Sequence, residues 1–294
     1  MTEQELSFGD RISASIGRMS PAERIVAEYL RDHGRYAIFA TADQIGSATR
    51  TSDATVVRTA KSLGFSGLLD LRRALASEVV VETNAVRNFH DLHGESVVAQ
   101  VFAEAIERLT VTSRLVDDSS FAAAVDLLAG AREVLGFGLG GSGLLARYLA
   151  IRLIRMGRRA RASWATGFQL ADDLLGLAAD DVVVLYTPSR ILGEIEVVLD
   201  HARSVGARVL LISSSLGALF ADRVDVTLAA PGSTTNFTGE MLSAEVLTDA
   251  LLLELASRDE TRATQASEGL AKLRSELVQG GGDPAPKRRR RRQD

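Results

Sequence analysis

A glycine-rich stretch near the middle of the chain has the residue types of a phosphate-binding loop. Residues 136–147 read GFGLGGSGLLAR, and three glycines have the spacing G-x-G-x-x-G, beginning at Gly138. The stretch follows an apolar run and opens a helical pattern, and at such a place backbone N–H groups and the helix dipole attract anions. We therefore expect a phosphate to contact Gly140, Gly141 and the hydroxyl of Ser142.

A second polar loop is expected to face the first. The sequence YTPSR follows another apolar run and precedes a helical pattern that carries Glu194. The carboxyl ends of neighbouring parallel strands open onto one crevice, so the two loops should meet there. The residues expected opposite the glycine loop are Thr187, Ser189, Arg190 and Glu194.

The glycine spacing has two other interpretations, a dinucleotide site and a plain turn from strand to helix. A dinucleotide site of the common type needs an acidic residue about 20 positions further on to hold the ribose. No Asp or Glu occurs between Glu133 and Asp172. A nicotinamide cofactor with a 2′-phosphate could instead use Arg159 or Arg161. A tight turn needs glycine for its backbone conformation alone.

Catalytic and metal-binding residues find little support in the sequence. An aldose–ketose isomerase needs a positioned base, and the two candidates, Glu194 and Glu240, have no visible partner. His90 and His93 could share a metal ion, but they lie in a polar stretch with no third ligand beside them. We expect no catalytic residue, no cofactor and no metal.

A stripe of hydroxyl groups near the amino terminus could contact DNA. Residues 41–49 and 52–64 predict two helices joined by a short turn, which is the arrangement of a helix-turn-helix. Hydroxyl residues in the second helix recur at spacings of 3, 4 and 3, with cations beside them, which suits a helix in a major groove. The alternative is a solvated face on an ordinary helical bundle. The residues expected to contact DNA are Arg50, Ser52, Thr55, Arg58, Thr59, Lys61 and Ser62.

The elements that carry these residues differ between the two halves of the chain. The first eighty residues predict helices only, with capping boxes at SPAE from Ser20 and TADQ from Thr41. Later, strands alternate with helices, which predicts βαβ units and a parallel sheet covered on both faces. The expected strands are 133–137, 158–163, 181–186, 207–213 and 225–230, and the expected helices are 96–115, 120–129, 143–156, 193–205, 215–222 and 238–258.

Composition and charge limit the class of protein. The chain has 294 residues, 46% of them hydrophobic, and no cysteine, which excludes disulfides and thiolate chemistry. The net charge is −4, although residues 287–292 alone contribute six positive charges. That basic tail is either a sequence-independent clamp on DNA or of no consequence. The amino terminus is not typical of a secretory signal and no stretch suits a membrane span, so a cytoplasmic protein is expected.

Both halves resemble one family of bacterial regulators. The helix-turn-helix of the RpiR/MurR family resembles the sequence SPAERIVAEYLRDH followed by SDATVVR, LGFSG and LR. At the turn, this chain has Arg50 where members of the family commonly have glycine. GLGGSG and the second loop resemble the sugar isomerase (SIS) domain that follows it in that family. The second loop departs from the usual S-x-S-G-x-T-x-E, because Arg190 replaces the glycine and Leu192 replaces the threonine.

The resemblance implies the organisation of the protein and its partners. It implies an all-α helix-turn-helix domain followed by an α/β, doubly wound, parallel five-stranded sheet. The expected boundaries are 1–82 for the DNA-binding domain, 83–96 for a linker, 97–262 for the SIS-like domain and 263–294 for a carboxy-terminal helix and basic tail. The implied function is a transcription regulator that binds double-stranded DNA as a homodimer or homotetramer and senses a phosphorylated sugar. A phosphosugar isomerase with an accessory helical domain is the alternative.

Overall fold

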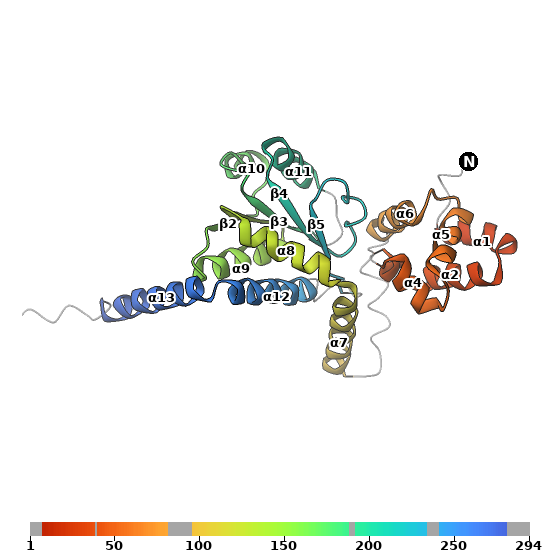
Figure 1. Ribbon diagram of the computed structural model, residues 1–294, viewed down its shortest axis with the longest axis horizontal. Coiled ribbons are helices and arrows are strands. Elements are labelled where there is room, and N and C mark those ends of the chain that lie inside the picture. The colour runs from red at the N-terminus through yellow and green to blue at the C-terminus, as the bar shows by residue number, and fades with distance from the viewer. Residues whose placement is uncertain (1–7, 39, 82–95, 188–191, 234–240, 281–294) are drawn as a thin grey trace, which may run out of the picture.

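A computed structural model describes residues 8–38, 40–81, 96–187, 192–233 and 241–280. A helical domain occupies one end of the molecule and an α/β domain the other, with a long final helix extending away from both (Figure 1). Within the described residues, no helix is long and apolar enough to cross a membrane. The predicted linker 83–96 and the basic tail lie outside the described residues, apart from Ser96.

The helical domain is built on capped helices around one apolar core. Ser20 and Thr41 each form the predicted capping box, with Glu23 and Gln44 as their partners. Each helix of the domain contributes apolar residues to one core, which includes the fully buried side chains of Val26 and Leu30. The elements are α1 (Phe8–Ser15), the 3-10 helix η2 (Ile16–Arg18), α2 (Pro21–Asp32), α3 (Gly34–Ala37), α4 (Ala42–Thr49), α5 (Asp53–Ser62) and α6 (Leu68–Val81).

The α/β domain is a five-stranded parallel sheet, as predicted. The strands lie in the order β2-β1-β3-β4-β5, and every neighbouring pair is parallel. They are β1 (Val134–Gly138), β2 (Ala160–Ser163), β3 (Val182–Thr187), β4 (Arg208–Ser213) and β5 (Val226–Ala229). This order makes the strand sequence reverse between β1 and β3, and ligands bind at such a switch point in open α/β sheets.

Helices cover both faces of the sheet (Figure 1). One face packs against α8 (Asp118–Gly130), α9 (Gly141–Arg155) and α12 (Leu242–Arg258). The other packs against α10 (Gly167–Leu174) and α11 (Gly193–Val205). Since both faces are buried, the central strands are mostly apolar, and all residues of β1 and β3 are buried.

Two long helices complete the chain, and both were expected. The helix α7 (Val97–Leu115) leads into the α/β domain, and α13 (Glu260–Gly280) follows α12. Only the carboxy-terminal part of α7 is buried, at residues that include Thr112 and Leu115. The rest of α7 projects from the body of the molecule (Figure 1).

The predicted elements differ from the structure in two places. The prediction of a helix over 215–222 is wrong, because this segment forms isolated turns. In these turns the backbone N–H groups of Leu219 and Phe220 donate to the carbonyl of Leu216. Gly217 approaches Thr227 of β5 so closely that a Cβ there would lie 2.7 Å from its methyl group, which holds the segment against the sheet. The helix α10 was not predicted, and it forms because Leu170 and Leu174 are buried against the sheet.

Candidate functional sites

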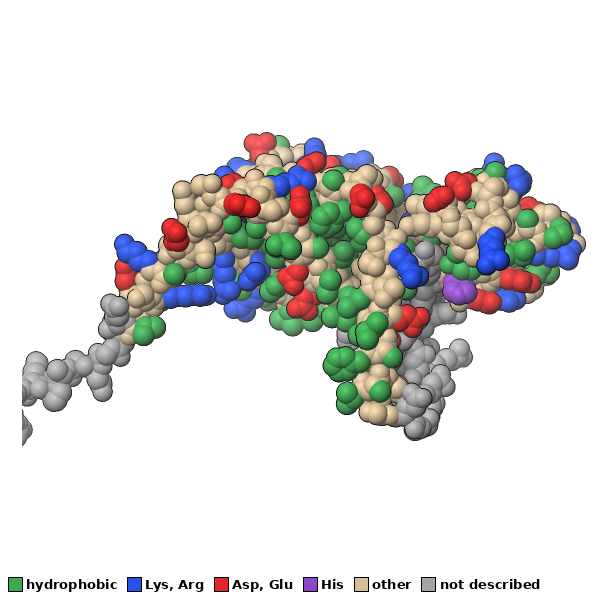
Figure 2. Space-filling model, turned by 60° about the horizontal axis from the view of Figure 1, so that its bottom comes forward, with side chains coloured by type: hydrophobic (Ala, Val, Ile, Leu, Met, Phe, Trp, Pro, Cys, Tyr) green, Lys and Arg blue, Asp and Glu red, His purple; other side chains and the backbone are tan. Residues whose placement is uncertain are grey.

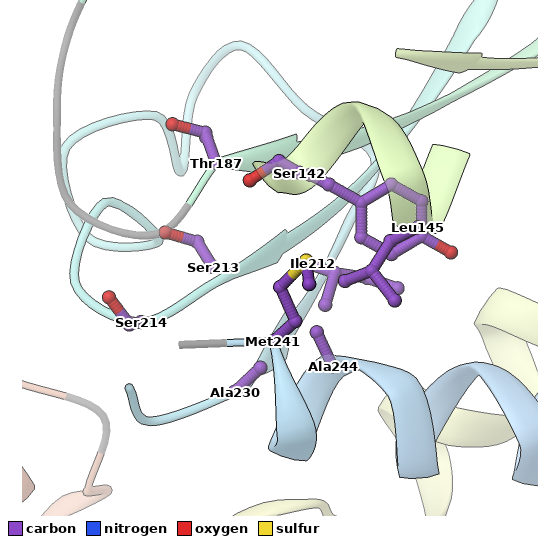
Figure 3. A pocket seen from close by; sticks show the side chains of 10 residues that line it. Ser142, Leu145, Thr187, Ile212, Ser213, Ser214, Ala230, Met241 and Ala244 are labelled. Atoms are coloured by element: carbon purple, nitrogen blue, oxygen red, sulfur yellow. The ribbon is translucent and has the colours of Figure 1, made fainter. Parts of the chain in front are cut away.

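A pocket opens at the carboxyl ends of the strands, beside the start of α9 (Figure 3). Its lining combines hydroxyl side chains with an apolar floor. The hydroxyls of Ser142, Thr187, Ser213 and Ser214 are turned toward the same side in Figure 3. Ser142 lies in the first turn of α9, Thr187 and Ser213 end β3 and β4, and Ser214 follows β4. The remaining lining residues are Leu145, Tyr186, Ile212, Ala230, Met241 and Ala244.

The described lining of this pocket supplies mainly hydrogen-bonding hydroxyl groups. The described lining includes no carboxylate, imidazole or cationic side chain. Tyr186 is its only titratable group, and burial raises the pKa of the phenol well above its ordinary value. The Tyr186 hydroxyl lies 2.9 Å from that of Thr248 and is therefore held within the core. Hydroxyl groups both donate and accept hydrogen bonds, so the pocket suits a polar, hydroxyl-bearing or anionic guest.

The glycines of the G-x-G-x-x-G motif have different structural roles. A Cβ on Gly138 would lie 2.7 Å from the carbonyl group of Ser142, and one on Gly143 would lie 2.7 Å from the Cβ of Trp164. These two glycines allow α9 to pack closely on the sheet. Gly140 has a φ of +58°, with open space where a Cβ would be. Much of the motif is thus explained by the tight turn, while the turn also places Ser142 in the pocket.

Of the predicted effector residues, the structure brings two into the pocket. Ser142 and Thr187 line it, whereas Gly140 and Gly141 are exposed at its edge at the start of α9. Ser189 and Arg190 lie outside the described residues. Glu194 is half-buried in the first turn of α11 and is not part of the lining.

Ser213 and Ser214 were missed, although the sequence contained a signal for them. Ser213 ends β4 and Ser214 follows it, in the run ISSS at the carboxyl end of a predicted strand. The rule that places the first two loops in one crevice applies equally to this third loop. Met241, at the start of α12, had no such signal because α12 reaches the pocket only through the tertiary fold.

A nicotinamide site that uses Arg161 is disfavoured by the contacts of that residue. The Arg161 Nε donates to Glu133 at 3.0 Å, so its charge is already paired between strands. Arg159 remains exposed. The packing roles of Gly138 and Gly143 do not discriminate between the interpretations, because the first and third glycines of a dinucleotide motif also allow a close strand-to-helix contact.

In the helical domain, α4 and α5 form the predicted helix-turn-helix. Ser52 caps α5, and its hydroxyl accepts from the N–H of Thr55. The side chains of Arg58 and Lys61 are exposed on α5, as are those of Ser52 and Ser62. The outer surface of α5 is therefore polar and carries two cations.

The hydroxyl stripe is not exposed along its whole length. Thr55 is 5% exposed and Thr59 is fully buried, and the Thr59 hydroxyl donates to the carbonyl of Thr55. Thr55 and Thr59 face the core of the domain because their neighbours Val56 and Ala60 are part of that core. Thr59 is therefore in no position to contact a base, which differs from the expected arrangement. Thr55 accepts from Arg58 and orients that guanidinium instead.

Ser62 connects α5 to the neighbouring helix α2. Its hydroxyl donates to Glu23, and the same carboxylate accepts from the backbone N–H and the hydroxyl of Ser20. Hydrogen bonds from Ser20, together with that from Ser62 and the charge of Arg58, lower the pKa of Glu23. The carboxylate thus remains charged and fixes the amino end of α2 against the end of α5.

Arg50 ends α4 in a left-handed conformation, with a φ of 54°. It is the only non-glycine residue with positive φ among those described. Left-handed backbone is costly for residues with a Cβ, which explains why glycine is favoured at such a position. The exposed Arg50 side chain lies at the turn between the two helices of the motif.

We expect Arg50→Gly to raise the free energy of unfolding by about 1 kcal/mol, because it removes this backbone strain. The matched control is Arg58→Gly within α5, which should lower stability by about 1 kcal/mol. Chemical denaturation of the two variants measures both effects. A loss of stability in Arg50→Gly would mean that the interactions of the Arg50 side chain stabilise the protein by more than its left-handed backbone destabilises it.

Comparison with known proteins agrees with both domains. Residues 8–81 match the family model described as the helix-turn-helix domain of the rpiR family. The chain is 31% identical over 171 residues to the uncharacterized HTH-type transcriptional regulator YbbH of Bacillus subtilis, covering 57% of this chain and 59% of that protein. It is 26% identical over 239 residues to the HTH-type transcriptional regulator RpiR of Escherichia coli, covering 80% of this chain and 79% of that one.

A solved structure shows the same fold over both domains. The Vibrio vulnificus NanR protein, complexed with ManNAc-6P, is 23% identical with a TM-score of 0.56, covering 92% of this chain and 99% of that chain. The class of protein is thus a helix-turn-helix domain joined to a sugar isomerase fold. The similarity to rpiR-type regulators is shown for the helix-turn-helix domain and extends into the α/β domain.

Proposed function

We propose that this protein is a sequence-specific, DNA-binding transcription regulator whose activity changes when a phosphorylated sugar or a related anionic metabolite binds in its α/β domain. One observation carries the proposal. A single chain joins an rpiR-type helix-turn-helix, with exposed cations on α5, to a pocket lined by four hydroxyls at the switch point of a parallel sheet. RpiR and YbbH, its relatives in sequence, are named as transcriptional regulators, which supports the same function.

The DNA contacts in this proposal come from the outer surface of α5 and the turn before it. Arg50, Arg58 and Lys61 would neutralise phosphates, and Ser52 and Ser62 would bond bases or phosphates. The test is a mobility-shift assay with the DNA upstream of the protein's own coding sequence against random duplex of equal length. A clear preference supports the proposal, and equal binding to both would refute sequence-specific recognition.

The effector in this proposal binds between α9 and the loops after β3 and β4. Sugar hydroxyls match the hydroxyls of Ser142, Thr187, Ser213 and Ser214. A phosphate is favoured at the amino end of the 15-residue helix α9, next to Gly140 and Gly141. NanR, which shares the fold, was solved with a phosphorylated sugar, and this supports the same ligand class here.

We expect sugar phosphates, N-acetylmannosamine 6-phosphate among them, to raise the thermal unfolding midpoint of the protein. A ligand present at 100 times its Kd adds about 2.7 kcal/mol to stability. Ser142→Ala should reduce this shift and leave DNA binding without ligand unchanged. The control is Ser204→Ala, which removes an exposed hydroxyl on α11. A shift that Ser142→Ala leaves intact would place the ligand elsewhere, and no shift with any sugar phosphate would refute the proposed effector class.

A phosphosugar isomerase is the second candidate, and the pocket favours it less. Isomerisation needs a base close to the carbon that loses its proton. Among the described residues, no carboxylate lines the pocket, and Glu194 lies outside the lining. Glu240 is not among the described residues. Turnover of common sugar phosphates by the purified protein would support the isomerase over the sensor.

The oligomeric state we propose is a homodimer, with the projecting part of α7 as one of its contacts. Hydrophobic side chains gather along this helix in Figure 2. An exposed apolar face of this kind marks an interaction site, and a second copy is the occupant that a two-fold DNA site requires. The exposed apolar residues are Val97, Val98, Val101, Phe102 and Ile106, each between 46% and 66% exposed.

We expect the double variant Phe102→Glu and Ile106→Glu to shift the protein from dimer to monomer, because two charges would be buried against the partner helix. Light scattering after gel filtration measures the mass. The control is Leu175→Glu, an 82% exposed leucine at the end of α10, which should leave the dimer intact. An unchanged mass in the double variant would exclude α7 from the interface.

A further inference from the structure

The segment between β4 and β5, residues 214–225, connects the pocket to the helical domain. Ser213 at the end of β4 and Ser214 at the start of the segment both line the pocket. Further along, Leu219 packs against both the core of the helical domain and the core beside α10 and α11. The segment therefore touches the pocket at one end and the DNA-binding domain at the other.

A side chain of α6 holds the far end of this segment. The Nε of Arg73 donates to the carbonyl of Ala218 at 3.0 Å, and its terminal nitrogen lies 3.5 Å from the carboxylate of Asp222. Ala218 is 2% exposed and the Arg73 side chain 39%, so the hydrogen bond is partly buried, while Asp222 is largely exposed. An exposed ion pair contributes little, so the hydrogen bond of Arg73 and the packing of Leu219 are the stronger contacts of this segment with the helical domain.

The near end of the segment is fixed by a pocket residue. The Ser213 hydroxyl accepts from the N–H groups of Ser215 and Leu216, at 3.3 Å and 3.0 Å. Leu216 and Phe220 are buried in the α/β core, so the segment is anchored in the middle as well. The backbone next to Ser213 is therefore well packed, and we expect a displacement of Ser213 to move the whole segment rather than only the adjacent residues.

A further contact between the helical domain and the rest of the chain is present among the described residues. Gln44 of α4 donates from its side chain to the carbonyl of Arg114, near the end of α7, at 3.0 Å. These contacts come from α4 and α6, whereas Arg58 and Lys61 lie on α5. The contacts thus determine how the helical domain is oriented and leave the outer surface of α5 accessible.

We propose that the β4–β5 segment transmits ligand occupancy from the pocket to the DNA-binding domain. A ligand bound at Ser213 and Ser214 shifts the start of the segment, and the shift reaches α6 through Ala218 and Leu219. In a dimer this changes the separation of the two α5 helices, which must match half-sites about 34 Å apart. The inference rests on the proposed function, since it assigns the regulation of the same pocket.

The first experiment needs neither ligand nor DNA. Ser213→Ala should raise amide hydrogen exchange in residues 68–75 of α6 several-fold, since the segment that packs on them loosens. The matched control is Ser142→Ala, which removes another hydroxyl of the same pocket from a different loop. Arg73→Ala should raise exchange in residues 215–222, and Arg31→Ala, at an exposed ion pair of the same domain, should not. Unchanged exchange in α6 for Ser213→Ala would overturn the proposal.

The second experiment measures the coupling itself. DNA affinity is compared with and without N-acetylmannosamine 6-phosphate or glucose 6-phosphate, whichever gives a thermal shift. Coupled sites typically change each other's affinity by about 5-fold to 150-fold. Arg73→Ala should bring this ratio close to one while the thermal shift persists, with the ligand-free affinity of the same variant as the reference for the ratio. A ratio that Arg73→Ala leaves unchanged would overturn the proposed route. Absence of DNA binding or of any thermal shift in the unaltered protein would refute the proposed function instead, and the exchange experiment would still decide whether Ser213 and α6 are coupled.

Discussion

Replacing Arg58 and Lys61 together by alanine is expected to weaken DNA binding on every sequence and to lower the slope of log affinity against log salt concentration by about two units. Each cation that neutralises a phosphate releases counterions, and each contributes about 0.9 to that slope. Both side chains are exposed on the outer surface of α5. Arg58 is also oriented by its hydrogen bond to Thr55, so in the proposed complex it would contact the DNA backbone from a restricted position.

Binding isotherms at several salt concentrations, on specific and random duplexes, measure this effect. The control is the double variant Arg155→Ala and Arg203→Ala, which changes the net charge equally but alters exposed residues of α9 and α11 in the other domain. If that control weakens binding as much as the α5 variant, the effect is one of net charge and α5 is not the DNA-binding helix. An unchanged salt slope in the α5 variant leads to the same conclusion.

The variant Gly138→Ala is expected to lower the free energy of unfolding of the α/β domain by about 3 kcal/mol, at the upper end of the usual cost of overpacking. Its Cβ would lie 2.7 Å from the carbonyl carbon and oxygen of Ser142, and backbone at the start of α9 has little freedom to move away. The displaced Ser142 would also disturb the pocket, so ligand binding should fall together with stability.

Two other glycines serve as controls in thermal and chemical unfolding. Gly176→Ala has nothing within 4 Å of the new methyl group and should change stability by less than about 1 kcal/mol. Gly140→Ala also meets open space but keeps a φ of +58°, so it should cost about 1 kcal/mol through backbone strain alone. If Gly138→Ala is as stable as Gly176→Ala, the close contact between β1 and α9 does not exist in solution.

These glycines show why the motif was ambiguous in sequence. Glycine in the spacing G-x-G-x-x-G can be favoured for three different reasons. These are a close strand-to-helix contact, a left-handed backbone conformation and the approach of a ligand to the backbone. A sequence records that glycine is present but not which atom a Cβ would meet. Only the positions of Ser142 and Trp164 reveal that Gly138 and Gly143 serve packing.

The hydroxyl stripe of α5 shows a similar limit. Its spacing correctly placed Ser52, Thr55, Thr59 and Ser62 along one side of a helix, but a spacing does not tell which side faces the core. Threonine is small and partly apolar, and its hydroxyl can be satisfied by the carbonyl of the preceding turn, so Thr59 is buried without cost. The charged side chains, whose burial is costly, were the better guide to the exposed surface.

By itself the sequence determined the elements whose signals are local. The capping boxes at Ser20 and Thr41, the alternation of strands and helices, and the order of the two domains follow from residues close together in the chain, where hydrogen bonding and side-chain period act directly. The tertiary structure alone decided which residues meet across the chain. It brought Ser213 and Met241 into the pocket, turned Thr59 inward, replaced the expected helix over 215–222 by turns, and placed Arg73 against Ala218. These outcomes depend on packing between segments distant in sequence, and that packing free energy outweighs the local preferences of any one segment.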